Sequence, residues 1–212
     1  MLKRAFDIVV AGVGLVLVAP LLALVALAVR LDSPGPVFFR QRRIGRGLVP
    51  FEVIKFRTMT HRERIDQHSE RVLEGNDDPR ITRVGRVLRV TSIDELPQLI
   101  NVLKGEMSLV GPRPILPEQL EVVPADRMSR FDVRPGITGL AQVKGRRSLD
   151  WMEQLAYDVD YARSPGLWRD LGILLLTVKV VLTGSGVYAD ASKNWRAYRK
   201  QVQEQGVAGE AK

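Results

Sequence analysis

The feature that most constrains this chain is a long apolar run close to its N-terminus, residues 5–29. As a straight α-helix, residues 8–29 would extend about 33 Å, enough to cross a bilayer core of about 30 Å. No other segment of the sequence is as long and as apolar. The sequence therefore predicts one membrane helix joined to a more polar body.

Three structures are compatible with this run: a cleaved signal peptide, a spanning helix, and a re-entrant hairpin that breaks at Pro20 and returns to the same side. Lys3-Arg4 and Ala26-Leu27-Ala28 fit a signal peptide. The run is longer than the apolar core of about 7–15 residues in such peptides, and Asp7 and Pro20 fit it poorly. A signal peptide is therefore the least favoured of the three.

Positive charge stands at both ends of the run and favours the hairpin. Lys3 and Arg4 precede it, and five arginines follow it: Arg30, Arg40, Arg42, Arg43 and Arg46. Basic residues prefer the cytoplasmic face of a membrane, so the simplest arrangement keeps both ends there. Pro20 removes a backbone hydrogen bond and divides the run into arms of about 18 and about 14 Å, each about one leaflet deep.

Composition limits the class of partner. The chain has 212 residues, enough for one sizeable core, and no cysteine, which excludes disulfides and thiolate chemistry. The net charge of +8 indicates a polyanionic partner: nucleic acid, anionic lipid or a nucleotide diphosphate. Aromatic residues are not interleaved with the basic runs, and no helix-turn-helix or zinc pattern occurs, so nucleic acid is not expected.

The chain is predicted to divide into three parts. Residues 33–36, Ser-Pro-Gly-Pro, form a turn that separates the membrane segment, residues 1–32, from a catalytic domain, residues 33–204. Residues 205–212 are expected to form a disordered tail. The fold class is α+β and mainly helical: a re-entrant membrane helix, a compact cytoplasmic domain with a small β-hairpin, and interfacial amphipathic helices.

Within the domain, residues 37–44 and 48–57 predict the two strands of the hairpin. Its arginines, Arg40, Arg42, Arg43 and Arg46, fit either lipid head groups or a solvated edge protected from aggregation. Helices are expected over 60–73 and 148–162, and a short strand over 140–143. Residues 167–183 predict a helix that packs in the core or lies in the membrane interface, because Asp170 and Lys179 interrupt it.

Asp94 and Glu95 are adjacent carboxylates where a helix is expected to begin. With Asp94 as N-cap, Pro97 falls in the first turn, where its missing N–H costs no hydrogen bond. Ser92 with Glu95 fits a capping box but moves Pro97 deeper, so Asp94 is preferred. In either register the carboxylates lie at the positive end of a helix dipole, where phosphate also binds. Ordinary capping is the alternative.

Four stretches together point to a family. They are SIDELPQLINVLKGEMSLVGPRP (92–114), KFRTM (55–59), TRVGRVLR (82–89) and RPGITGL (134–140). This set closely resembles the monotopic phosphoglycosyl transferases, the bacterial sugar transferase family, from about residue 3 to about residue 190.

The resemblance implies transfer of a phosphosugar from a UDP-sugar to a polyprenol (undecaprenyl) phosphate, with release of UMP, as the first membrane step of glycoconjugate assembly. It implies that Asp94 is the nucleophile, through an aspartyl-phosphosugar intermediate, and that Glu95 supports it. It also implies a bacterial inner membrane location, with the catalytic domain on the cytoplasmic face, and a re-entrant helix. Homodimer formation is left open. The family often has serine before the proline, whereas this chain has Ala19.

The other candidate residues are cations and a metal ligand. Five are expected to bind substrate phosphates: Lys55, Arg57, Arg83, Arg113 and Arg134. Mg²⁺ is expected as the cofactor, held by Asp94 and Asp158 together with phosphate oxygens. Surface salt bridges are the alternative for Lys55, Arg57 and Arg83, and a solvated helix face is the alternative for Asp158.

Two other functions remain open from the sequence. The first is a membrane-anchored basic protein without catalytic activity, which the arginine content would fit. The second is a glycosyltransferase that moves the sugar without its phosphate and releases UDP.

Overall fold

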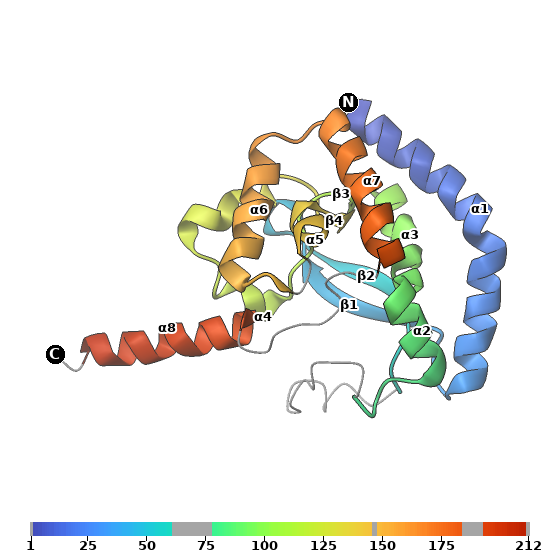
Figure 1. Cartoon of the computed structure of the whole chain (residues 1–212), viewed down its shortest axis with the longest axis horizontal. Helices are drawn as coiled ribbons and strands as arrows, with labels where there is room; N and C mark the ends of the chain where they lie inside the picture. Colours follow the sequence, from blue (N-terminus) through green and yellow to red (C-terminus); the bar gives the residue numbers. More distant parts are fainter. Residues whose placement is uncertain (1, 61–77, 146–147, 184–192, 211–212) are drawn as a thin grey trace.

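In a computed structural model, the chain is mostly helical and carries two small two-stranded sheets (Figure 1). The structure describes residues 2–60, 78–145, 148–183 and 193–210. The mainly helical character and the small sheet agree with the predicted fold class. The helix expected over 60–73 falls almost wholly outside the described residues.

The apolar run forms one helix, α1 (Leu2–Asp32), with Pro20 inside it. Figure 1 shows this helix bending near its middle and wrapping around the body of the molecule. A proline removes one backbone hydrogen bond and commonly kinks a helix, while the turns on either side keep their own bonds. The expected interruption of the helix at Pro20 is therefore wrong, because α1 is bent but continuous.

The N-terminal half of α1 packs against α3 (Leu99–Lys104) and β3 (Ser108–Val110). Its buried Asp7 accepts hydrogen bonds from the Ser108 hydroxyl, at 2.8 Å, and the Leu109 N–H, at 3.1 Å. Lys3 forms an ion pair with the buried Asp170 of α7 (Leu167–Thr183). The charged residues Lys3 and Asp7 thus bind the N-terminal part of this helix to the domain.

The C-terminal end of α1 is bound to the same domain. Buried Arg57 donates to the Pro34 carbonyl at 2.7 Å and to the Ser33 carbonyl at 2.6 Å, just beyond the helix. Asp32 accepts the Val84 N–H of α2 (Arg83–Thr91) at 2.9 Å. Both ends of α1 are therefore held by one body.

The outward face of α1 is apolar and exposed. Among its exposed side chains are Val9, Val13, Val16, Leu17, Leu24 and Leu31. By length and composition, α1 is the one helix in the described part of the chain that could cross a membrane. This surface is compatible with membrane anchoring.

The predicted hairpin is confirmed. Strand β1 (Phe38–Ile44) pairs antiparallel with β2 (Pro50–Phe56) across a short turn, η1 (Arg46–Leu48). In β1, every second residue from Phe39 to Arg43 is partly buried, and these residues form one face of the hairpin. Lys55 is directly opposite Phe39 and therefore lies on this same face, together with Gln41 and Arg43.

The second sheet differs from the prediction. Strand β3 pairs in parallel with β4 (Gly136–Thr138), and the strand expected over 140–143 is wrong because α5 (Leu140–Lys144) occupies that position. A Cβ on Gly136 would lie 2.1 Å from the Gly111 nitrogen, so this close approach of two backbones requires glycine. Pairing ends at Thr138, and the chain turns into the helix.

The remaining helices follow β3 in the chain. They are α4 (Pro117–Leu120), η4 (Ala125–Phe131), α6 (Trp151–Arg163), α7 and α8 (Trp195–Glu210). The predicted helix around Asp158 is confirmed as α6, which a capping box of Asp150 and Glu153 starts. Helix α8 projects from the body and continues to Glu210, so most of the expected disordered tail is helical (Figure 1). No proline interrupts the sequence there.

The helix expected over 167–183 is confirmed as α7, and its packing in the core is confirmed for one face. Asp170 and Ile173 of α7 are buried against the core, whereas Trp168, Leu175 and Leu182 are largely exposed. Tyr161 donates to Asp170 at 2.6 Å and to the Val110 carbonyl at 3.0 Å, so the charge inside the apolar helix has partners. One face of α7 is therefore core, and the opposite face is an exposed apolar surface.

We expect Asp7→Ala to lower the free energy of unfolding by about 2–4 kcal/mol, because it leaves the buried Leu109 N–H and Ser108 hydroxyl without their charged acceptor. Thermal melting in detergent measures the effect. Val9→Ala, at a neighbouring position that is 62% exposed, is the matched control and should melt close to wild type. Equal melting temperatures for the two variants would show that Asp7 does not hold α1 on the domain.

Candidate active site

The carboxylate pair lies in a short 3-10 segment rather than at the start of an α-helix. Asp94 and Glu95 occupy the first turn of η3 (Ile93–Gln98), which follows Ser92 in the left-handed region at φ 59°. No side chain caps this segment, and α3 begins only at Leu99. The preferred register is therefore wrong, because Ser92 and not Asp94 is the N-cap residue, and the capping box of the alternative register does not form. Because η3 has six residues, we base the electrostatics on side-chain charges instead of a helix dipole.

Glu95 is clamped between two cations from distant parts of the chain. Its Oε1 accepts a hydrogen bond from Lys55 Nζ at 2.7 Å and another from Arg113 Nη2 at 2.9 Å. Lys55 comes from β2, and Arg113 comes from the Pro-Arg-Pro loop after β3. This ion triad joins three segments at one point, and it places Lys55 and Arg113 beside the carboxylate pair.

The charge state of Glu95 follows from its two partners. Burial by itself would raise the pKa of the Glu95 carboxyl, but the charges of Arg113 and Lys55 outweigh it and hold that pKa well below its usual range. Burial in turn lowers the pKa of the Lys55 ammonium. Glu95 is thus a fixed anion at neutral pH.

Asp94 has the opposite environment. Burial, reinforced by the negative charge of Glu95, raises the pKa of Asp94 from 3.8 to about 6. Its carboxylate forms no hydrogen bond or ion pair with any other described residue. Of the two adjacent carboxylates, one is therefore held by cations and the other is open to an incoming group.

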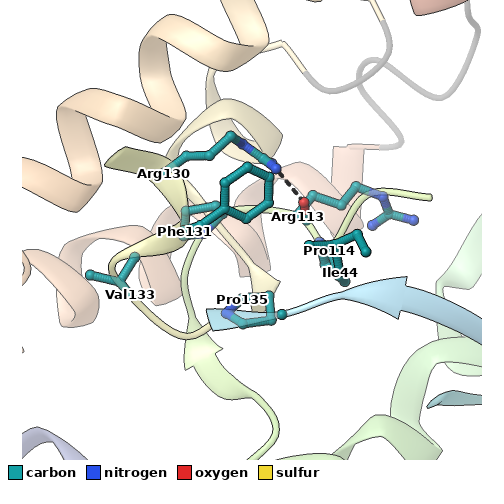
Figure 2. A pocket seen from close by; sticks show the side chains of 9 residues that line it. Ile44, Arg113, Pro114, Arg130, Phe131, Val133 and Pro135 are labelled. Atoms are coloured by element: carbon teal, nitrogen blue, oxygen red, sulfur yellow. Dashed lines mark hydrogen bonds between the residues drawn. The ribbon is translucent and has the colours of Figure 1, made fainter. Parts of the chain in front are cut away.

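The loop that carries Arg113 is braced from behind. Arg130 of η4, which is almost completely buried, donates to the Arg113 carbonyl at 2.8 Å and to Asp158 Oδ2 at 2.6 Å. Figure 2 shows the guanidinium of Arg113 pointing away from Arg130. The Pro112 and Pro114 rings line a shallow pocket beside this brace. Arg113 is thus presented to Glu95 by a rigid backbone, while its own side chain stays 43% exposed.

Asp158 does not stand beside the carboxylate pair as a metal ligand. It is buried, and it accepts two hydrogen bonds from Arg130, at 2.6 and 3.1 Å. A carboxylate committed to a buried guanidinium is a structural partner whose loss leaves an uncompensated charge. The geometry assigns Asp158 to the support of the Arg113 loop.

Three other predicted phosphate-binding arginines lie elsewhere. Arg57 is buried and holds the end of α1. Arg134 donates to the Gly105 carbonyl at 2.8 Å and so fixes the C-terminal cap of α3. Arg83 is exposed at the first position of α2. The structure brings none of these three into contact with Asp94 or Glu95.

Two arginines near the site were not among the predicted site residues. Arg43 lines a second small pocket together with Lys55, Gln98 and Arg113, although it was grouped with the lipid-facing or edge arginines. Arg89, near the end of α2, is close enough to lower the pKa of Asp94 by its charge. The alternation of a strand, with side chains on opposite faces at every second residue, would have separated Arg43 from Arg40 and Arg42.

The metal-ligating side chains near Asp94 fit a magnesium ion in one mode only. No group of three or more histidine, cysteine or acidic side chains gathers anywhere in the described ranges. Mg²⁺ commonly binds through one or two carboxylates, with substrate phosphates and water as the other ligands. The unpaired carboxylate of Asp94 suits that mode, whereas Asp158 does not.

We expect the Asp94 carboxyl carbon to titrate near pH 6 in ¹³C NMR, well above an ordinary aspartate. Asp94→Asn removes the resonance and so assigns it. Glu95→Gln should move the pKa of Asp94 downward, because it removes an adjacent negative charge and frees Lys55 and Arg113 to act on Asp94 alone. Titration near pH 4 in the wild type, or an upward movement in Glu95→Gln, would contradict this electrostatic account.

Comparison with known proteins adds the family. A profile described as bacterial sugar transferase matches residues 1–184. The chain is 49% identical over 194 residues to the UDP-glucose:undecaprenyl-phosphate glucose-1-phosphate transferase of Caulobacter vibrioides, covering 88% of this chain and 72% of that protein.

Two further relatives differ in length. The exopolysaccharide production protein ExoY of Rhizobium meliloti is 39% identical, with 89% of this chain and 88% of the relative covered. The UDP-glucose:undecaprenyl-phosphate glucose-1-phosphate transferase of Escherichia coli is 46% identical, with 84% of this chain but 39% of the relative covered. The match over most of the chain, together with the carboxylate pair and its cations, shows that this protein belongs to the bacterial sugar transferase family.

Proposed function

We propose that this chain transfers a phosphosugar from a UDP-sugar to a polyprenol phosphate through an aspartyl-phosphosugar intermediate on Asp94, and releases UMP. The chain is an enzyme of the sugar-phosphate transferase class, the level on which the names of its curated relatives agree. Those names support UDP-glucose and undecaprenyl phosphate as the classes of donor and acceptor. The observation that carries the mechanism is the asymmetry of the two carboxylates: Glu95 is neutralised, and Asp94 is unpaired.

In the first half-reaction, a carboxylate oxygen of Asp94 attacks the phosphorus that bears the sugar. A new Asp94–phosphorus bond forms, and the bond from that phosphorus to the bridging oxygen breaks. The bridging oxygen leaves with UMP. Lys55 and Arg113 stabilise the phosphate oxygens, and Arg113 offers its exposed N–H groups as a fork.

In the second half-reaction, an oxygen of the polyprenol phosphate attacks the same phosphorus. The Asp94 carboxylate is the leaving group and returns to its ionised form, and the product is a polyprenol diphosphosugar. A carboxylate with a pKa near 6 is ionised at neutral pH, and it is a better leaving group than an alkoxide would be. Glu95 keeps both cations in position through both steps.

A divalent cation is part of the proposal. When bound to Asp94 and the donor's phosphates, Mg²⁺ would neutralise the charge that otherwise repels an anionic nucleophile. Glu95 is less suited to hold it, because Lys55 and Arg113 already occupy Oε1.

The membrane placement is also proposed. Both ends of α1 are bound to the catalytic domain, through Lys3 and Asp7 at one end and through Asp32 and Ser33 at the other. A helix that crossed the bilayer would carry its two ends to opposite faces. The two anchors, together with the bend and the apolar outer face, support a re-entrant helix with the domain on the cytoplasmic face of a bacterial inner membrane.

We expect the enzyme with donor and Mg²⁺, in the absence of polyprenol phosphate, to release one equivalent of UMP and to carry a phosphosugar mass on the peptide containing Asp94. Asp94→Asn should abolish both signals, because an amide is a far weaker nucleophile. The rate of UMP release should rise with pH through about 6, as Asp94 becomes ionised. Mass spectrometry and a nucleotide assay provide the measurements.

The outcomes of this experiment separate the alternatives. Release of UMP only when acceptor is present would favour direct attack by the polyprenol phosphate, with Asp94 as a metal ligand. Release of UDP instead of UMP would identify a glycosyltransferase that leaves the phosphate behind. An adduct that still forms in Asp94→Asn would move the nucleophile to another residue.

We expect single cysteines at Leu2 and Pro36 to react from the cytoplasmic side with a membrane-impermeant thiol reagent. Both positions are exposed, and the chain has no native cysteine to interfere. Labelling in inverted and right-side-out vesicles is the measurement. A cysteine at position 2 that reacts only from the periplasmic side would mean that α1 spans the membrane.

A further inference from the structure

Arg43 lies inside the site, on the inner face of the hairpin. It is directly opposite Phe51 in the register of β1 and β2, on the same face as Lys55. Its guanidinium donates to the Pro114 carbonyl at 3.2 Å and to Gln41 Oε1 at 2.7 Å. The first contact ties Arg43 to the loop that carries Arg113.

The acceptors of Arg43 are neutral. No carboxylate in the described part of the chain forms an ion pair with it, and Glu95 and Glu118 act on it only at longer range. Burial and the charge of Arg113 lower the pKa of Arg43 to about 10, which still leaves it protonated at neutral pH. A partly buried cation without a carboxylate partner, beside another cation, favours an anion from outside the chain.

The pocket that Arg43 lines also carries more positive than negative charge. Arg43, Lys55 and Arg113 line it together with Val53, Gln98 and Pro114. Three cations therefore face two carboxylates: Glu95, which both Lys55 and Arg113 already share, and Asp94. The excess of positive charge matches a diphosphate group.

Arg40 and Arg42 have none of these properties. Both are exposed on the other face of β1, and Arg40 lies 3.8 Å from Glu52 across the hairpin. Arg42 is directly opposite Glu52 in the register. Neighbouring arginines of one strand thus lie in different environments, and Arg42 is a matched control for Arg43.

We infer that Arg43 is a third donor-binding cation, which contacts the diphosphate of the UDP-sugar next to Lys55 and Arg113. This inference rests on the proposed function, because it assigns Arg43 to the first half-reaction. The phosphate of the polyprenol acceptor has the same chemistry, so the experiment has to distinguish the two sources.

The test compares full-length wild type with Arg43→Gln, Arg43→Lys and Arg42→Gln. The first measurement is the increase in melting temperature with UDP and Mg²⁺, which reports diphosphate binding without turnover. The second is the UMP burst with UDP-glucose and no acceptor. Arg43→Gln should raise the half-saturating concentration of UDP and of donor by about tenfold to a hundredfold, because a charge-assisted hydrogen bond is lost.

Arg42→Gln should stay within about twofold of wild type, as expected for an exposed charge. Arg43→Lys should fall between the two, because it keeps the charge and loses the fork. In the full reaction at saturating donor, the half-saturating concentration of polyprenol phosphate should be unchanged in all variants.

Three results would overturn the assignment. The first is equal UDP binding in Arg43→Gln and Arg42→Gln. The second is a change in the half-saturating concentration of polyprenol phosphate alone. The third is loss of folding in both Arg43 variants, which would make Arg43 structural. A wild type that binds UDP but forms no adduct would refute the proposed covalent mechanism instead, and the comparison of UDP binding would still decide the role of Arg43.

Discussion

The ion triad of Lys55, Glu95 and Arg113 is the interaction on which the site depends. Each member comes from a different segment, and the Glu95 carboxylate is the single point at which they meet. Partly buried charges of one sign repel each other, and a counter-charge between them offsets this repulsion. Glu95 therefore allows two cations to stand side by side, and it leaves the adjacent Asp94 without a cation of its own. The asymmetry in pKa between the two carboxylates follows from that arrangement.

A buried ion pair behind the Arg113 loop keeps this triad in place. Arg130 is paired with Asp158 and donates to the backbone of Arg113, so the loop is fixed without use of the Arg113 side chain. Losing one partner of such a buried pair is costly, because the other charge is left without compensation. Asp158 and Arg130 thus act on the site through position, at a distance from any substrate.

The membrane helix and the site share the same scaffold. Asp7 of α1 binds the backbone of β3, and the Pro-Arg-Pro loop follows β3 directly. Arg57, at the end of β2, binds the chain just after α1, while Lys55 of the same strand binds Glu95. The elements that carry Lys55 and Arg113 are therefore the ones that hold the two ends of α1, which places the candidate site at a set distance from the apolar surface.

Periodicity and local chemistry determined much of this protein from the sequence: the apolar helix, the hairpin, the helix around Asp158 and the adjacent carboxylates Asp94 and Glu95. These features depend on neighbours in the chain, so spacing and composition contain them. Which arginines bind substrate and which support the backbone is a different matter. Arg57 and Arg134 became structural because folding brought backbone carbonyls within their reach, and Arg43 entered the site because of strand register. The sequence records a guanidinium, but its role depends on the acceptors around it, and only the tertiary structure decides those.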